Sequence, residues 1–206
     1  MAAPALGAAG TPLYSIAPGG PYTAGMWSIG HSTRTLEGLA ALLRANDVTA
    51  VADVRRFPRS RRHPHFDTGA LARDLPALGV AYAHWPGLGG FRRARPDSPN
   101  TGLRHPSFRG YADYMATAEF ARELDALLAS AALRPTAIMC AEAVPWRCHR
   151  SLIADALAAR GVVVRHIVGP GPPEPHRVTA GARLEGGRVL YPGEPDLFSG
   201  PSARGR

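Results

Sequence analysis

The segment around Cys148 carries the residues best suited to covalent chemistry. Arg147 precedes this cysteine and His149 and Arg150 follow it, at the point where a helix is expected to begin. A helix N-terminus and nearby cations lower the pKa of a thiol and favour the nucleophilic thiolate. The same arrangement can bind a phosphate without covalent chemistry, because free backbone N–H groups point out of the helix. Both roles stay open for Cys148, with its three neighbours as anion-binding residues.

Glu142 is a second candidate catalytic residue in the same segment. A carboxylate beside arginines can act as a general acid, a general base or a nucleophile at an anomeric carbon. Its alternative role is a structural ion pair with Arg147 or Arg150. The chain has one further cysteine, Cys140, and its spacing to Cys148 and His149 matches no strong zinc motif. We therefore predict neither a metal site nor a cofactor.

An arginine-rich loop is the second region suited to a function. Residues 55–62 contain five arginines and follow an apolar segment directly. Guanidinium groups bind phosphate through paired hydrogen bonds, and the nearby Phe57 and Phe66 offer flat faces to bases. The alternative is a solvated loop. We predict that the anion-binding residues of this loop are Arg55, Arg59, Ser60 and Arg61.

Asp53 and His31 complete the predicted catalytic group. Asp53 ends an otherwise apolar segment, where it could orient an arginine, contact a ribose or act as a base; its alternative is a structural pair with Arg55. His31 lies in the turn Gly30-His31-Ser32-Thr33, which could hold an anion on backbone N–H groups, or it is a hydrogen-bonded histidine at a strand end. The turn lacks the glycine patterns of a dinucleotide fingerprint or a P-loop.

The apolar periodicity indicates which elements position these residues. It predicts strands at 26–29, 48–54, 80–85, 136–141 and 162–168, and helices at 35–45, 68–78, 108–130 and 149–160. This alternation is typical of a three-layer α/β fold with a mainly parallel sheet. Ligands bind such folds at the carboxyl ends of the strands. The loops 30–33, 53–62 and 140–150 should therefore be neighbours.

Length and composition set the domain organisation. The chain has 206 residues, enough for one domain at 26–168. Residues 1–25 are rich in Ala, Gly and Pro and are expected to be a disordered extension. Residues 169–206 are expected to form a Pro/Gly-rich tail with a short hairpin around Gly186-Gly187.

The charge of the chain favours anionic partners. The formal net charge is +8, and all 24 basic residues are arginine, which indicates a coding bias as well as a positive surface. Nucleic acid or a phosphorylated small molecule is the expected partner. We find no signal-peptide pattern and no apolar window long enough for a membrane span, and so expect a cytoplasmic protein with no membrane partner.

Several short motifs occur in an order that resembles a known family. They are Ser28-Ile29-Gly30-His31-Ser32, Asp53-Val54-Arg55, Leu88-Gly89-Gly90, Gly110-Tyr111-Ala112-Asp113-Tyr114-Met115, Cys140-Ala141-Glu142 and Cys148-His149-Arg150. Over about residues 26–168 the chain resembles the domain-of-unknown-function 488 family. The resemblance implies a Rossmann-like three-layer fold. It marks as motif positions His31, Asp53, Arg55, Pro58, Ser60, Arg61, Glu142, Cys148, His149 and Arg150.

These observations lead to one expected function and two alternatives. We expect an enzyme acting on nucleic acid or nucleotides, through glycosidic-bond chemistry or thiolate chemistry on a base, with arginines holding phosphate. The first alternative is a non-catalytic nucleic-acid or nucleotide binding module. The second is a thiol-based redox or metal-responsive protein that uses Cys140 and Cys148.

Overall fold

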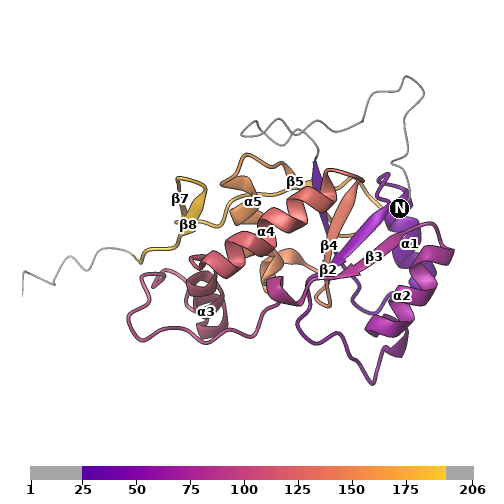
Figure 1. Ribbon diagram of the computed structural model, residues 1–206, viewed down its shortest axis with the longest axis horizontal. Helices are drawn as coiled ribbons and strands as arrows, with labels where there is room; N and C mark the ends of the chain where they lie inside the picture. Colours follow the sequence, from indigo (N-terminus) through magenta and orange to yellow (C-terminus); the bar gives the residue numbers. More distant parts are fainter. Residues whose placement is uncertain (1–24, 194–206) are drawn as a thin grey trace, which may run out of the picture.

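The computed structural model describes residues 25–193, which form a six-stranded sheet flanked by helices (Figure 1). The strand order is β3-β2-β4-β1-β5-β6, and β1 to β5 are parallel while β6 is antiparallel to β5. The strands are β1 (Met26–Gly30), β2 (Ala50–Asp53), β3 (Ala81–His84), β4 (Thr136–Cys140), β5 (Val164–Ile167) and β6 (Glu174–Pro175).

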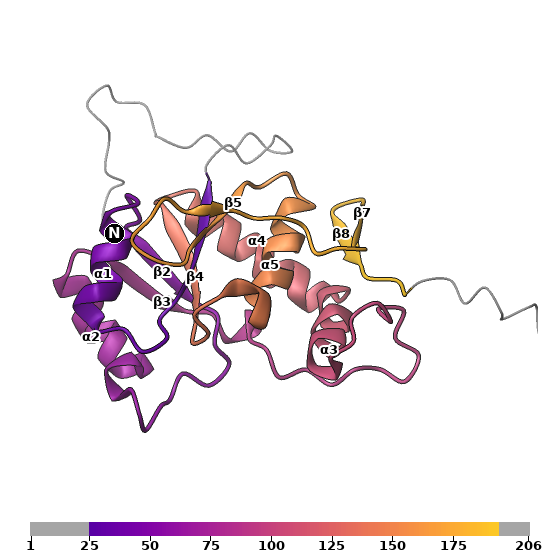
Figure 2. The ribbon, with the colours of Figure 1, turned by 180° about the vertical axis from the view of Figure 1, so that it is seen from behind.

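Five helices cover the two faces of this sheet, as Figures 1 and 2 show from opposite sides. They are α1 (Leu36–Arg44), α2 (Thr68–Ala77), α3 (Pro106–Met115), α4 (Ala118–Ala131) and α5 (Arg150–Ala158). In β4, Ala137 and Met139 pack with α1 and α2, whereas Ile138 and Cys140 pack with α3, α4 and α5. Alternate residues of a strand point to opposite faces. The predicted three-layer α/β fold with a mainly parallel sheet is confirmed.

The prediction of one long helix over residues 108–130 is wrong, because two helices occupy this stretch. α3 ends at Met115 and α4 begins at Ala118. Thr117 caps α4: its Oγ1 accepts from the backbone N–H of Phe120 at 3.2 Å and donates to the carbonyl of Tyr114 at 2.7 Å. A threonine side chain that satisfies a free N–H group favours a helix start. The apolar spacing continues across the break, so periodicity alone concealed it.

Residues 169–193 pack on the domain instead of leaving it. β6 extends the sheet, and the side chain of Tyr191 is buried and donates to Asp155 at 2.7 Å. A hairpin of β7 (Arg183–Glu185) and β8 (Arg188–Leu190) turns at two glycines with positive φ, which confirms the predicted hairpin. Apart from Gly25, the extension predicted to be disordered lies outside the described residues. No helix within 25–193 has both the length and the apolar character to cross a membrane.

A buried chain of hydrogen bonds ties this C-terminal segment to the sheet. Ser28 Oγ bonds His166 Nδ1 at 2.8 Å, His166 Nε2 bonds His176 Nδ1 at 3.0 Å, and His176 Nε2 bonds Asp155 Oδ1 at 2.9 Å. With both histidines neutral, each bond has one donor and one acceptor. Burial, with the nearby His176 and Arg150, lowers the pKa of His166 to about 4.

Stability should fall as the pH is lowered towards 4. In the unfolded chain His166 takes up a proton near its ordinary pKa of 6.5, whereas the folded protein resists protonation until about pH 4. The unfolded state therefore binds more protons between these values, which disfavours folding. Urea denaturation at pH 7.5 and 5 should give a lower free energy of unfolding at pH 5. His166→Gln should reduce this difference and the exposed control His105→Gln should not; equal pH dependence in both variants would contradict the assignment.

The end of β1 approaches the loop after β4 so closely that only glycine fits. A Cβ placed on Gly30 would lie 1.8 Å from the backbone oxygen of Glu142. Gly30→Ala should therefore lower the free energy of unfolding by about 2 kcal/mol or more, because two backbone segments must separate. A Cβ on Gly69, in the first turn of α2, meets nothing within 4 Å. Gly69→Ala should leave stability equal or slightly higher, and thermal unfolding of both variants checks the contrast.

Candidate active site

The loops that follow β1, β2 and β4 meet at the carboxyl edge of the sheet. The backbone N–H of His31 donates to the carbonyl of Cys140 at 3.0 Å, and that of Val54 donates to the carbonyl of Met139 at 3.0 Å. The ring Nε2 of His149 lies 3.0 Å from the carbonyl oxygen of Val54. The three loops expected to be neighbours therefore lie together, with the predicted candidates distributed over them.

A buried ion pair between Asp53 and Arg55 forms the base of this site. Asp53, at the end of β2, has no exposed surface. Its carboxylate accepts from Arg55 Nε at 2.8 Å and Nη2 at 2.6 Å, and from the hydroxyl of Tyr82 at 2.9 Å. Arg55 Nη2 also donates to the carbonyl of Phe66 at 2.8 Å. The structural alternative for Asp53 is the one that this geometry supports. Tyr82, on β3, was not among the predicted site residues.

His31 is neutral and is held from both ring nitrogens. Arg55 Nη1 lies 3.1 Å from His31 Nε2, and His31 Nδ1 lies 3.0 Å from the carbonyl oxygen of Ser32. A guanidinium only donates and a carbonyl only accepts, which fixes the tautomer with the proton on Nδ1. Burial and the charge of Arg55 lower the pKa of His31 to about 4. Together with Asp53, this histidine orients Arg55, whose nitrogens all have protein partners.

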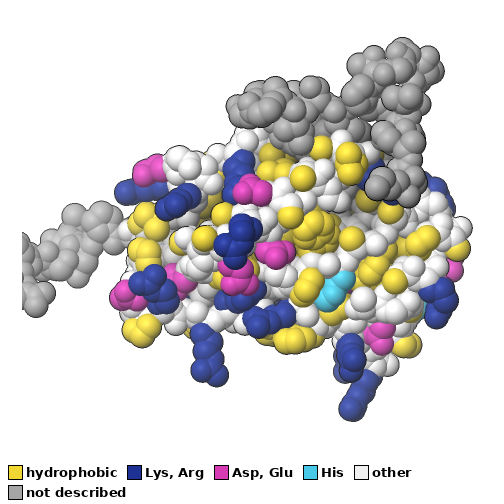
Figure 3. Space-filling view, viewed as in Figure 1, with side chains coloured by type: hydrophobic (Ala, Val, Ile, Leu, Met, Phe, Trp, Pro, Cys, Tyr) yellow, Lys and Arg dark blue, Asp and Glu magenta, His cyan; other side chains and the backbone are white. Residues whose placement is uncertain are grey.

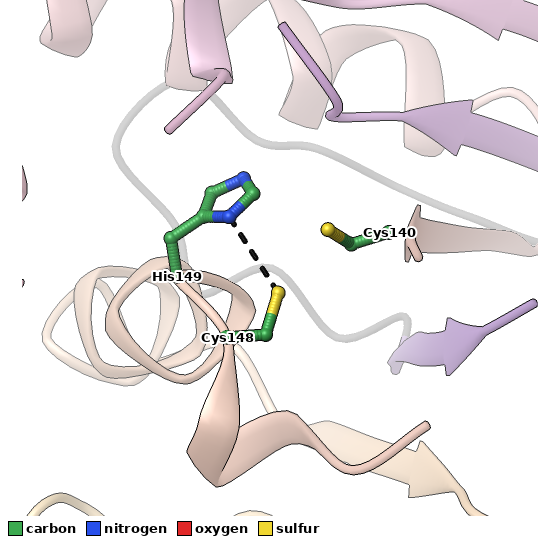
Figure 4. A group of neighbouring side chains, drawn as sticks. All are labelled: Cys140, Cys148 and His149. Carbon is green, nitrogen blue, oxygen red and sulfur yellow. Dashed lines mark hydrogen bonds between the residues drawn. The ribbon is translucent and has the colours of Figure 1, made fainter. Parts of the chain in front are cut away.

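A thiol and an imidazole face each other above the buried ion pair. Cys148 precedes α5, and its Sγ lies 3.5 Å from Nδ1 of His149, as Figure 4 shows. Since Nε2 of His149 contacts the carbonyl of Val54, that nitrogen carries the ring proton and Nδ1 is free to accept one. A nucleophile next to a base that a third group orients is the arrangement of cysteine-dependent enzymes. His149, predicted as an anion-binding residue, thus contacts the thiol; its adjacency to Cys148 in the sequence was the available signal.

Cys140 lies beside this pair and was not among the predicted site residues. It ends β4, and its side chain points towards Cys148 and His149 (Figure 4). A hydrogen bond from the Cys140 thiol, with further contributions from His149 and Arg150, holds the pKa of Cys148 well below its usual value despite burial. The interaction with Cys148 and burial raise the pKa of Cys140 well above its usual value. The two thiols therefore differ in acidity, and Cys148 is the more acidic of the two.

Both thiols are buried, and the turn that follows β3 packs beside His149. Cys148 is 5% exposed and Cys140 is 8% exposed. The ring of Tyr111 lies 5.1 Å from that of His149, and a Cβ placed on Gly90 would lie 3.3 Å from Nδ1 of the same imidazole. The hydroxyl of Tyr111 donates to the carbonyl of Leu88 at 2.7 Å, which fixes the turn on α3.

Arg150 is a buried cation beside the thiols. It is 1% exposed, and it donates from Nη2 to the backbone oxygen of Glu142 and from Nη1 to Ser28 Oγ at 3.4 Å. Within residues 25–193 its buried Nε has no hydrogen-bond partner. A buried donor without a partner is uncommon and is available to an incoming acceptor. The carboxylate of Glu142 is exposed, and the described residues contain no ion pair between it and an arginine.

The remaining predicted residues divide into one structural and three exposed side chains. Ser60 Oγ accepts from the backbone N–H of His63 at 3.1 Å, and its own N–H donates to Asp67 at 2.8 Å, so Ser60 stabilises its loop. Arg59, Arg61 and Arg147 are exposed. Of the predicted anion-binding residues, these three project into solvent.

Three side chains of the site are close enough to share one ion. The ligand atoms of Cys140, Cys148 and His149 all lie within 4.8 Å of one another. Two sulfurs and an imidazole nitrogen are a ligand set that suits a soft cation such as Zn²⁺. The hydrogen bonds within the group also account for its proximity without an ion.

The fold and the site define a parallel α/β protein with a thiol and imidazole pair at the carboxyl edge of its sheet. Residues 35–157 match the family described as domain of unknown function DUF488, and the chain belongs to this family. The matched range contains Asp53, Arg55 and the segment from Cys140 to Arg150, while β1 and His31 precede it. Comparison with curated proteins and with solved structures gave no match.

Removing Asp53 should lower the free energy of unfolding far more than removing an exposed carboxylate. Asp53→Ala leaves the charge of Arg55 buried without a partner, which costs about 3–5 kcal/mol of unfolding free energy. The double variant Asp53→Leu/Arg55→Met should lose less, because no charge stays buried. Asp74→Ala removes the exposed pair between Asp74 and Arg73 and should leave stability unchanged. Denaturation curves of the three variants test this order; equal losses for Asp53→Ala and Asp74→Ala would contradict it.

Proposed function

We propose that this protein is an enzyme that uses the thiolate of Cys148 as a nucleophile on a nucleotide or nucleic acid. The hydrogen bond between Cys148 Sγ and His149 Nδ1 is the observation that carries the proposal. In the proposed reaction His149 takes the thiol proton, and the sulfur attacks an electrophilic carbon of a modified base or sugar. The leaving group departs with the electron pair of the broken bond.

The neighbouring side chains support thiolate chemistry over the use of Glu142. Cys140 donates to the sulfur of Cys148, and the charge of Arg150 stabilises the anion. The unpaired Nε of Arg150 adds a donor for a developing negative charge. Glu142 is exposed and lacks such partners among the described side chains, so a general acid or base role for it has less support.

The charge of the carboxyl edge supports an anionic substrate. The exposed Arg59 and Arg61 follow β2, and the exposed Arg147 lies one residue before Cys148. These guanidinium groups are free to contact phosphates, in contrast to Arg55 and Arg150. The net charge of +8 adds a long-range attraction for polyanions.

The nearness of a second thiol favours one alternative, a thiol-based redox function. Cys140 and Cys148 lie within 4.8 Å of each other at their sulfurs. A hydroperoxide could oxidise both thiols to one disulfide, with release of an alcohol and water. Peroxide treatment followed by thiol counting separates the two functions, because a redox protein should lose both thiols rapidly and regain them with a dithiol reductant.

The reactivity of Cys148 towards iodoacetamide tests the main proposal. In the presence of a strong metal chelator, mass spectrometry should locate alkylation at Cys148, with a midpoint well below the usual thiol pKa of about 8.5. His149→Asn should slow the reaction at pH 7 about tenfold, because the proton acceptor is lost. Single-stranded DNA or a nucleotide should protect Cys148 if it binds at the site.

Two variants make this result interpretable. His105→Asn changes an exposed histidine and should leave alkylation unchanged. Cys140→Ala removes one donor to the sulfur and should shift the midpoint upwards without abolishing the reaction. If Cys148 reacts only in denaturant, or if zinc copurifies in a one-to-one ratio and its removal unfolds the chain, the nucleophile role is excluded.

A further inference from the structure

Two exposed aromatic side chains lie side by side near the thiol site. Phe57, in the loop after β2, is 70% exposed, and Phe91, in the turn after the short helix η2 (Pro86–Leu88), is 82% exposed. Their ring centroids are 6.5 Å apart, with the planes inclined by 42°. Single exposed apolar residues are common on protein surfaces, but adjacent exposed rings indicate a contact surface for another molecule.

The backbone of Phe91 is held in an unfavourable conformation. Its φ is +61°, in the left-handed region that bulky residues rarely occupy. The exposed ring gains little from burial, so packing does not offset this strain. Residues held in such conformations occur preferentially at binding and catalytic sites. The strain therefore supports a function for the ring outside the folded core.

The two loops that carry the rings are joined by Arg56. A Cβ on Gly89 would lie 2.7 Å from the Cα of Arg56, so the two backbones are in contact. Arg56 Nη1 donates to the carbonyl of Phe91 at 3.4 Å, and its guanidinium carbon lies 5.6 Å from the centroid of the Phe57 ring. The rings are therefore held at a defined separation with a cation beside them.

The surroundings of the rings are positively charged. Residues 55–66 and 86–96 contain no aspartate or glutamate. Figure 3 shows arginine side chains projecting from the lower edge of the molecule, over the region where the loop after β2 lies in Figure 1. The exposed arginines of the two loops are Arg59, Arg61, Arg62, Arg93 and Arg95. Arg95 is paired with Asp97, which leaves the other four for an anionic partner.

We propose that Phe57 and Phe91 form a stacking platform for an unpaired base of a single-stranded nucleic acid, with the exposed arginines contacting its phosphates. Aromatic rings for bases combined with arginines for the backbone are the common means of binding single strands. A duplex keeps its bases stacked on each other and offers them less well to a protein ring. RNA and DNA share this chemistry, and the platform accepts either.

Two short connections join the platform to the thiol site. Gly90, adjacent to Phe91, packs against the ring of His149. Arg56, adjacent to Phe57, lies two residues after Val54, whose carbonyl contacts His149. A strand bound on the rings could therefore present a neighbouring nucleotide to Cys148; only this last step rests on the proposed function, and binding itself does not.

Fluorescence anisotropy with labelled oligothymidylate and oligouridylate of roughly fifteen nucleotides tests the platform. The Cys148→Ser chain is used so that covalent reaction does not contribute. Phe57→Ala and Phe91→Ala should each weaken binding about tenfold, and affinity should fall steeply between about 50 and 200 mM salt. Leu133→Ala is the matched control: this 76% exposed residue lies beside Ala50 and Ala81, at the amino edge of the sheet.

Two further comparisons separate charge and fold from stacking. Arg59→Ala should weaken binding more than Arg134→Ala, which removes the same charge at the opposite edge. Phe91→Gly should weaken binding without lowering the melting temperature, because glycine accepts a positive φ. If Phe91 instead has a structural role, Phe91→Gly should lower the melting temperature and leave binding unchanged.

The proposal is overturned if Phe57→Ala and Phe91→Ala bind as tightly as Leu133→Ala, if duplex DNA binds as well as single strands, or if neither strand binds. It is also overturned if sedimentation shows a dimer that these two variants dissociate, since the rings would then cover a second copy of the chain. If single strands bind through the two rings but Cys148 resists alkylation, the platform stands and the proposed enzyme is excluded. If Cys148 is reactive but binding does not depend on the two rings, the proposed enzyme stands and the platform is excluded.

Discussion

The buried ion pair between Asp53 and Arg55 is the interaction on which the carboxyl edge of this protein depends. The pair connects the end of β2 to β3 through Tyr82, to the turn after β1 through His31, and to the following loop through the carbonyl of Phe66. Each of these contacts satisfies a polar group that burial would otherwise make costly. The loops after the strands therefore have one favourable arrangement, and the candidate site is built on it.

The thiol site depends on this ion pair through a single backbone atom. The carbonyl of Val54 follows Asp53 directly and determines which nitrogen of His149 carries the proton. The other nitrogen then faces Cys148, and Cys140 approaches from β4 because its strand lies beside β2. Because the parallel strands end at the same edge of the sheet, Cys140 at the end of β4 meets Cys148 and His149 at the start of α5. No local sequence motif for a metal or a disulfide is needed for this arrangement.

The arginines of this edge serve two different purposes. Arg55 and Arg150 are buried, and their guanidinium groups bind carboxylate, carbonyl and hydroxyl oxygens of the protein. Arg59 and Arg61 project into solvent from the loop that also carries the exposed ring of Phe57. The inner cations fix the geometry, and Arg150 also lowers the pKa of the Cys148 thiol, whereas the outer cations are exposed. This separation gives the site a rigid interior and an accessible rim.

The sequence by itself determined the layered architecture and the edge of the sheet that carries the candidates. Apolar periodicity and strand and helix alternation are local properties, so the three-layer α/β fold, most element positions and the hairpin near Gly186 could be predicted from it. The break at Thr117 was missed because the apolar spacing runs through it. Only the tertiary structure decided that Arg55 is structural while Arg59 is exposed, that His149 bonds Cys148, that Cys140 lies beside this pair, and that Phe91 is exposed next to Phe57. These roles depend on which side chains meet across separate loops and on how much water each retains, and neither property is encoded in the spacing of residues along one segment.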